Sequence, residues 1–219
     1  MVQNSYTIVI VKYFVIYLRW VLMKNVTEKD FLDFISRKED KRHLISEVFD
    51  DFTNSIIPEL SQKKVDACHE TRNVYQISGA TKLSSANTIT RTYNTELGLL
   101  WEKIADLAPN VVSPELDFHF KIPEVDVIVL YEDKLYYTQL KTQRNTLTGS
   151  QGNRTVDELK KFPYNWFVAC IDTDASWTAP KTLNRLVGRE FWEKIGIDYD
   201  RDILPNLKKS IMKIEETFM

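Results

Sequence analysis

The sequence lacks the residues that most metal-binding and disulfide-rich proteins carry. Its two cysteines, Cys68 and Cys170, are too few for a disulfide framework, and neither has a neighbour at metal-ligand spacing. The three histidines, His43, His69 and His119, are scattered, which indicates structural or surface roles. A zinc site is therefore not expected, and the reduced cysteines fit a cytoplasmic protein.

The sequence also lacks a surplus of basic residues. Lys and Arg number 29 and Asp and Glu number 31, which gives a formal net charge of −2. A nucleic-acid site would therefore have to be a local patch and not the whole surface. The chain of 219 residues is 43% hydrophobic, which is enough for one sizeable core. Because no repeat or low-complexity linker divides it, we expect one domain over residues 23–219.

One apolar stretch stands apart, YTIVIVKYFVIYLRWVL over residues 6–22. Lys12 and Arg19 interrupt it, and it has neither a basic segment before it nor a small-residue cleavage site after it. Its β-branched and aromatic residues suit a strand as well as a helix. We interpret residues 1–22 as an upstream extension before a start at Met23, or as an added strand or helix. A membrane contact is the third and least favoured alternative, so no membrane partner is expected.

Hydrophobic spacing and capping residues predict several helices. Thr27 with Asp30 three residues later forms a capping-box pattern, which is typical of a helix start. Pro109 ends another helical pattern, TELGLLWEKIADLA. The polar stretch SGATKLSSANTITRTYN before that helix indicates no clear element. The helices expected cover residues 27–36, 41–60, 95–108, 154–161 and 204–218.

Alternating apolar residues predict strands near 124–131, 135–142 and 165–172. With the helices, they predict an α/β fold in which a central mixed sheet is flanked by helices. The first two strands read as a hairpin. If Glu132 and Asp133 form its turn, residue numbers across the hairpin sum to 265, which places Asp126 opposite Gln139.

This register gathers polar residues on one face of the sheet. Gln139 and Lys141 are two residues apart and share a face, and Asp126 joins them across the strands. Their apolar neighbours are expected on the opposite face: Val125, Val127, Val129 and Leu140. A turn of odd length would shift the register by one residue and separate the polar group. The alternative is an ordinary strand pair with a solvated lysine.

The three side chains suit metal-assisted hydrolysis of a phosphodiester. A carboxylate and an amide oxygen can hold Mg²⁺, which keeps several waters and can supply one as the nucleophile. The ammonium of Lys141 can orient that water or offset charge that builds on the phosphorus oxygens.

The segment PEVDVIVLYEDKLYYTQLK, together with the helix GLLWEKIADL before it, resembles the core of the PD-(D/E)xK nuclease superfamily. The resemblance covers roughly residues 95–172 and implies a restriction-endonuclease-like core. It implies that Asp126 is the first acid and that Gln139 and Lys141 form the second half-motif. Gln139 stands where the family usually has an acid, which removes one negative charge from the metal site.

The resemblance also implies further ligands for the metal. The first core helix of the family often contributes a glutamate, and Glu102 matches that position, ahead of Glu96. The metal ligands expected are therefore Asp126, Gln139 and Glu102. Asp117, in SPELDFHF, is a rival acid that ranks second because it lies outside the simple hairpin pairing.

A polar segment, TLTGSQGNR, follows the strand that ends in Lys141. It resembles the loop-to-helix segment of type II restriction endonucleases, where base reading is coupled to cutting. Arginine pairs with guanine and Asn or Gln with adenine in the major groove. An ordinary polar surface loop is the alternative. The DNA-binding residues expected here are Arg144, Asn145, Gln151, Asn153 and Arg154.

These features predict a type II restriction endonuclease that uses Mg²⁺ to cut double-stranded DNA. A homodimer and a companion DNA methyltransferase are implied by the resemblance alone. One alternative is a repair or junction nuclease of the same superfamily, which reads DNA shape. Another is a catalytically inactive DNA-binding relative, in which Gln139 marks decay of the site.

Overall fold

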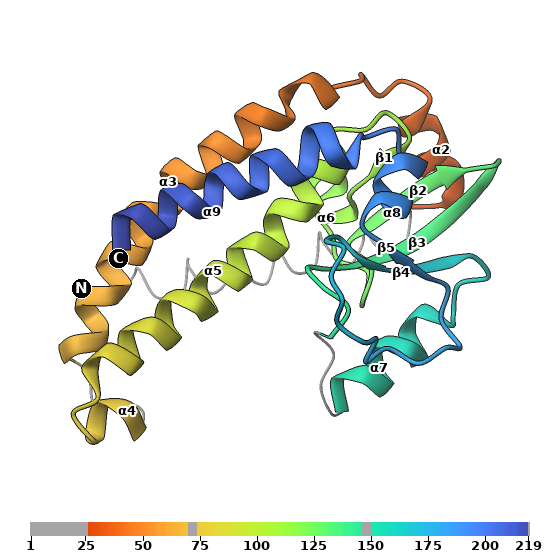
Figure 1. The fold of residues 1–219 in the computed structure, drawn as a ribbon. Coiled ribbons are helices and arrows are strands. Elements are labelled where there is room, and N and C mark those ends of the chain that lie inside the picture. Colours follow the sequence, from red (N-terminus) through yellow and green to blue (C-terminus); the bar gives the residue numbers. More distant parts are fainter. Residues whose placement is uncertain (1–25, 70–73, 146–149, 219) are drawn as a thin grey trace, which may run out of the picture.

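The computed structural model describes residues 26–69, 74–145 and 150–218 (Figure 1). The apolar segment at residues 1–22, interpreted above as an extension or added element, lies outside them. The helices are α2 (Glu28–Ile35), α3 (Ile45–His69), α4 (Val74–Ile77), α5 (Thr81–Asp106), α6 (Pro114–Phe118), α7 (Ser150–Leu159), α8 (Arg189–Lys194) and α9 (Leu204–Phe218). Two short helical turns, η1 (Arg42–Leu44) and η2 (Tyr199–Ile203), precede α3 and α9. Among the described residues, no helix is long and apolar enough to cross a membrane.

A five-stranded mixed sheet forms the centre of the fold. Its strands lie in the order in which they occur in the sequence. The first three pair antiparallel, and the third, fourth and fifth pair parallel. The expected α/β fold with a mixed sheet is therefore confirmed. The strands are β1 (Val111–Val112), β2 (Val127–Tyr131), β3 (Lys134–Lys141), β4 (Asn165–Ala169) and β5 (Arg185–Val187).

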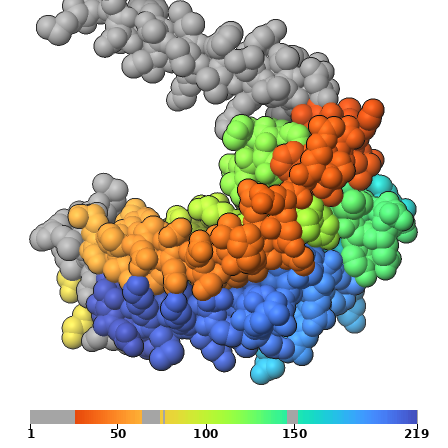
Figure 2. Space-filling model, turned by 90° about the horizontal axis from the view of Figure 1, so that it is seen from above, coloured from red at the N-terminus to blue at the C-terminus, as the bar shows by residue number. Residues whose placement is uncertain are grey.

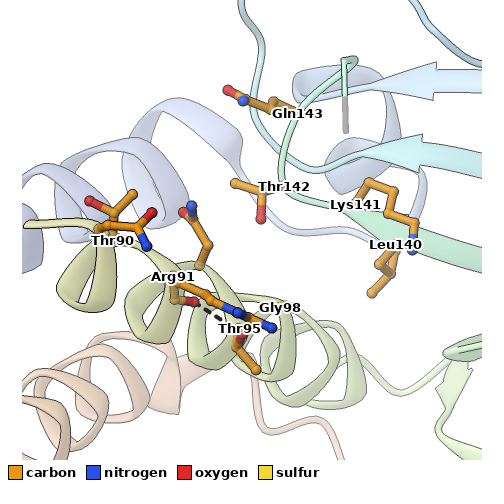
Figure 3. Close-up of a pocket in the computed structure, with 10 residues that line it drawn as sticks. Thr90, Arg91, Thr95, Gly98, Leu140, Lys141, Thr142 and Gln143 are labelled. Carbon is orange, nitrogen blue, oxygen red and sulfur yellow. Dashed lines mark hydrogen bonds between the residues drawn. The ribbon is translucent and has the colours of Figure 1, made fainter. Parts of the chain in front are cut away.

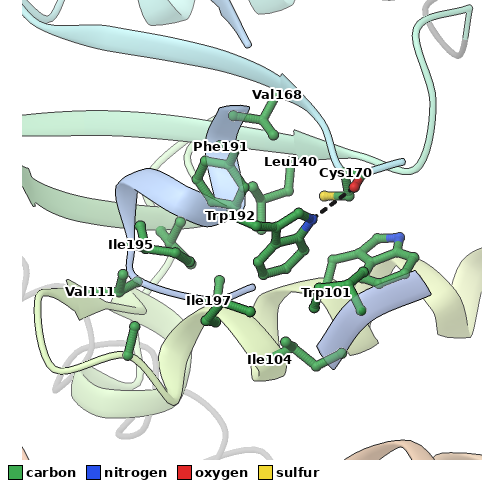
Figure 4. Close-up of a cluster of buried hydrophobic side chains, with 14 of the residues drawn as sticks. Trp101, Ile104, Val111, Leu140, Val168, Cys170, Phe191, Trp192, Ile195 and Ile197 are labelled. Carbon is green, nitrogen blue, oxygen red and sulfur yellow. Dashed lines mark hydrogen bonds between the residues drawn. The ribbon is translucent and has the colours of Figure 1, made fainter. Parts of the chain in front are cut away.

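Helices cover both faces of this sheet. On one face, α3, α5, α8 and α9 pack over the strands, and Trp101 lies 6.0 Å from Trp192 between ring centroids (Figure 4). The indole N–H of Trp192 donates to the carbonyl of Cys170 at 2.8 Å, which ties α8 to the end of β4. On the other face, α2 and α7 contribute Phe31, Ile35, Val156 and Leu159 to a second core.

Three long helices extend beyond the sheet. In Figure 2, α3 and α9 lie side by side along one face of the molecule. The hydroxyl of Thr53 donates to the hydroxyl of Ser210 at 2.7 Å in the buried seam between them. Ile56, Leu60 and Ile214 form a small apolar cluster in the same region. Ile89 and Tyr93 of α5 pack against this cluster, so α5 extends away from the sheet together with α3 and α9 (Figure 1).

Several predicted elements are confirmed. The carboxylate of Asp30 accepts bonds from the N–H and hydroxyl of Thr27, each at 2.7 Å, so the capping box at the start of α2 is present. The C-terminal helix spans the residues expected. The helix expected over residues 41–60 is α3, which runs on through Pro58 to His69.

Two boundaries were predicted wrongly. The helix expected to begin at residue 95 begins at Thr81, because Ser84 and Ser85 are buried and Ile89 and Tyr93 pack against the cluster between α3 and α9. Tertiary packing thus makes a helix from residues of weak propensity. The helix expected near residue 154 begins at Ser150, so part of the supposed polar loop is the first turn of α7.

The hairpin register is confirmed. Val127 pairs with Thr138, and Tyr131 pairs with Lys134 across a turn made by Glu132 and Asp133. Both turn residues have left-handed backbone, with φ of 48° and 57°. Such turns follow the twist of the flanking strands, which explains why a two-residue connection fits here.

Val125 corrects one detail of the predicted pattern. It was expected beside Val127, Val129 and Leu140, which indeed share one core, but it packs in the core on the opposite face. It lies just before β2 and follows Glu124, whose φ is 58°. Strand alternation does not extend across that backbone reversal.

The turn yields a test of the register. Replacing Glu132→Asn and Asp133→Gly should raise the free energy of unfolding by about 1 kcal/mol, because Asn and Gly adopt left-handed backbone with less strain. Urea unfolding measures the change. The control is the pair Glu132→Gln and Asp133→Gln, which removes the same charges and keeps both side chains. Equal stability of the two double variants would contradict this assignment of the turn.

Candidate active site

The hairpin places the carboxylate of Asp126 against β3. Its Oδ2 accepts hydrogen bonds from Gln139 Nε2 at 2.5 Å and from the N–H of Leu140 at 2.7 Å. The N–H of Asp126 donates to the carbonyl of Thr138 at 2.9 Å. The predicted contact of Asp126 with Gln139 is therefore present. Burial raises the pKa of Asp126 to about 6, against the effect of the Leu140 bond and the charge of Lys141.

Lys141 lies two residues beyond Gln139, at the end of β3, and lines the same pocket as Asp126 and Gln139. It is half-buried, and its ammonium makes no ion pair with a described residue. Its carbonyl accepts from the N–H of Cys170 at 2.7 Å, which anchors the end of the strand to β4. The lysine therefore has a fixed backbone and a side chain that is available to a ligand.

Glu102 reaches this pocket from α5. Its side chain is buried, and Ser113 Oγ donates to its Oε1 at 2.5 Å. Burial raises the pKa of Glu102, and the Ser113 bond opposes that shift. Glu96 does not line the pocket. Sequence reasoning missed Ser113, although Ser followed by Pro114 is a helix-start signal, and Ser113 indeed caps α6.

The pocket has a volume of about 410 Å³ and contains charges of both signs. Lys121 pairs with Glu115 at 2.8 Å, and Arg154 lies 3.6 Å from Glu124. The hydroxyl of Thr155 donates to Glu124 at 2.8 Å, which joins α7 to the segment before β2. Its charged and amide residues are Glu102, Glu115, Lys121, Glu124, Asp126, Gln139, Lys141 and Arg154.

The pocket contains carboxylate and amide oxygens from Glu102, Asp126 and Gln139. Among the described residues, no group of three or more His, Cys, Asp or Glu side chains is placed to hold a metal ion. Asp126 Oδ1 and Gln139 Oε1 accept no hydrogen bond from described residues. Mg²⁺ is usually held by one or two carboxylates and keeps several waters. Asp126 and Gln139, with Glu102 beside them, supply that kind of donor set.

The expected DNA-binding residues are not all gathered in one place. Arg144 Nη2 pairs with Asp172 at 2.7 Å, which holds this arginine against the segment after β4. Arg154 and Asn153 lie exposed on α7, and Arg154 lines the pocket. Asn145 is exposed in the segment after β3, and the side chain of Gln151 lies outside the described set.

Asp117, the rival acid, belongs to a different cluster. Its Oδ2 accepts from the N–H of Ser113 at 3.0 Å and lies 3.4 Å from Lys38 Nζ. Lys38 also pairs with Asp106 at 2.5 Å and donates to the carbonyl of Val111 at 2.8 Å. Asp117 does not line the pocket of Asp126. The cluster instead holds the end of α5 against β1 and thereby supports the Ser113–Glu102 contact.

Comparisons with known proteins identify no family for this chain. No protein-family model matches the chain, and the curated proteins give no match. The interpretation of the pocket therefore depends on its own residues and on the resemblance of its hairpin motif.

The Lys38 cluster predicts a pH dependence of stability. Burial raises the pKa of Asp106 to about 7, with Lys38 opposing the shift and Asp117 adding to it. Between about pH 4 and pH 7 the carboxyl of Asp106 is protonated in the folded chain and ionised in the unfolded chain. The free energy of unfolding therefore falls as the pH rises through this range, and the loss is complete above about pH 7. Relative to Asp106→Asn, the wild type should lose up to about 3 kcal/mol between pH 5 and pH 8.

Urea unfolding across this pH range measures the difference. Asp50→Asn is the control, because Asp50 is half-exposed in a surface pair with Lys209 and its loss should leave the pH profile unchanged. Parallel profiles for the wild type and Asp106→Asn would contradict the prediction.

Proposed function

We propose that the protein is a Mg²⁺-dependent endodeoxyribonuclease with a restriction-endonuclease-like core, and that it cuts double-stranded DNA at specific sites as type II restriction enzymes do. One observation carries this proposal. Asp126, Gln139 and Lys141 occupy one pocket with Glu102, in the hairpin register that the nuclease motif requires.

Each residue has a role that follows from its chemistry. Gln139 turns its amide nitrogen to Asp126 Oδ2, which leaves Asp126 Oδ1 and Gln139 Oε1 for a metal, and Glu102 adds a second carboxylate from α5. When bound by these oxygens, Mg²⁺ supplies Lewis-acid polarisation of the phosphate and lowers the pKa of water. Lys141 donates hydrogen bonds to the attacking water or to a non-bridging phosphate oxygen as negative charge develops there. A lysine without a carboxylate partner among the described residues is suited to that task.

Support for site-specific cutting comes from α7. Asn153 and Arg154 are exposed on its first turns, and Arg154 lies beside the pocket, so side chains capable of base contacts stand close to the cleavage centre. A homodimer, which would present two such centres to a duplex, is part of the same proposal.

One observation favours a shape-reading repair or junction nuclease as the second candidate. Arg144, which was expected to read bases, is held by Asp172. A nuclease with fewer base contacts would rely more on the DNA backbone. The pattern of products separates the two functions: discrete fragments indicate site-specific cutting, whereas nicks or cutting only at junctions indicate shape reading.

The test is digestion of plasmid DNA and of junction-containing DNA with Mg²⁺ and with a chelator. Wild-type protein should cut only with the metal. Lys141→Ala should lower the cleavage rate by about 10²–10⁴-fold, because the lysine acts on charge that forms in the transition state. Lys134→Ala is the matched control, since Lys134 lies at the other, exposed end of β3 and should be dispensable.

Cutting that continues in the chelator, or that is unchanged in Lys141→Ala, would contradict the proposed chemistry. Wild-type protein that binds DNA and cuts none of these substrates would indicate the inactive relative.

A further inference from the structure

A second pocket opens beside the candidate active site. It lies between α5 and the segment that leaves β3, and its volume is about 820 Å³ (Figure 3). Lys141 lines both pockets, so the second adjoins the first at the lysine. We call the second pocket the α5 groove.

One face of α5 forms a wall of the groove. Its residues recur at intervals of three or four, which places them on one side of a helix. All are exposed, and none is apolar. They are Asn87, Thr90, Arg91, Asn94, Thr95 and Gly98. In Figure 3, Arg91 and Thr95 lie opposite Thr142, and Lys141 lies beyond it on the strand that leads into this segment.

The described residues that line the groove are rich in hydrogen-bond donors and include no acid. Arg91 and Lys141 are its cations, and no Asp or Glu is among its lining residues. Trp101 Nε1 donates to Thr142 Oγ1 at 3.2 Å, so the threonine oxygen is occupied as an acceptor while its hydroxyl hydrogen can still be donated. Phosphate oxygens accept hydrogen bonds and carry negative charge. The groove therefore suits a phosphate better than a cation or another ligand that binds to carboxyl groups.

Gly98 leaves open space on the groove side of α5. It lies inside α5, where glycine is a poor helix former. A Cβ built on it meets no atom of the protein within 4 Å, so no internal contact requires a glycine there. Its absent side chain leaves the helix backbone open to the groove.

We propose that the α5 groove holds the phosphate backbone of the DNA next to the bond that is cut, so that α5 is a DNA-contacting helix. This rests on the proposed nuclease function for the identity of the ligand. Arg91 pairs with a phosphate, and the side chains of Asn87, Asn94 and Thr90 donate to neighbouring phosphates, whereas the hydroxyl of Thr95 donates to the carbonyl of Arg91 at 3.1 Å. The strand passes over Gly98 towards Lys141.

The test is binding of a duplex DNA probe to the full chain, in a chelator so that no cutting occurs, at several salt concentrations. Arg91→Ala should weaken binding and reduce the slope of log affinity against log salt by about 1, as loss of one phosphate contact does. The matched control is Lys82→Ala, which removes a cation from an exposed position of α5 outside the groove and should leave the slope unchanged.

Gly98 gives a steric test. Gly98→Leu should weaken binding about tenfold or more by filling the space for the strand. Gly98→Ala is its control for folding, and it should raise the melting temperature by about 2–4 °C, because alanine favours the helix. Equal DNA binding by the wild type, Arg91→Ala and Gly98→Leu would overturn the groove proposal. So would a salt slope that falls as much in Lys82→Ala as in Arg91→Ala.

The outcomes separate this proposal from the proposed function. If the protein cuts DNA with Mg²⁺ and neither groove variant changes the cutting, the nuclease function is supported and the proposed role of the groove is contradicted. Binding that depends on Arg91 and Gly98, in a protein that never cuts DNA, would support the groove and contradict the nuclease. Wild-type protein that binds no DNA would contradict both.

Discussion

The candidate active site depends on the register of one β-hairpin. The Glu132–Asp133 turn sets Tyr131 opposite Lys134, and this pairing brings Asp126 to Gln139 at the far end. A slip of one residue would turn the side chains of β3 over and move Gln139 and Lys141 away from Asp126. Packing on both faces prevents that slip, because Leu140 would leave one core, and Leu135 and Tyr137 would leave the other. Core packing and site geometry thus stabilise the same pairing.

Burial gives the site its electrostatic character. Asp126 and Glu102 share one pocket, and burial raises the pKa of both carboxylates. Two carboxylates in a poorly solvated pocket repel each other when ionised, and a bound divalent cation relieves that repulsion. Lys141 supplies the nearby positive charge from the protein. The α5 groove begins at this same lysine, and its described lining residues include no acid, so the proposed metal site and the proposed phosphate site adjoin at Lys141.

The sequence was informative where a local rule decides the structure. Hairpin pairing follows from turn length and alternation, and the capping box of Thr27 and Asp30 acts within one helical turn. The first half of α5 could not be predicted, because Ile89 and Tyr93 become helical through packing against the region of α3 and α9. The groove was not predicted either, because Arg91 and Gly98 lie on one face only if their segment is a helix. The pairing of Arg144 with Asp172 joins residues that are distant in the sequence, and no local pattern indicates it.

Direct mapping of the metal position is the most decisive measurement. Fe²⁺ in place of Mg²⁺, with ascorbate and peroxide, generates radicals that break the peptide chain beside the bound ion, and mass spectrometry locates the breaks. We expect breaks near Glu102, Asp126 and Gln139, with loss of all three in excess Mg²⁺ and in Asp126→Ala. Breaks confined to other segments, or unchanged in Asp126→Ala, would show that the hairpin is not the metal site and would contradict the nuclease proposed here.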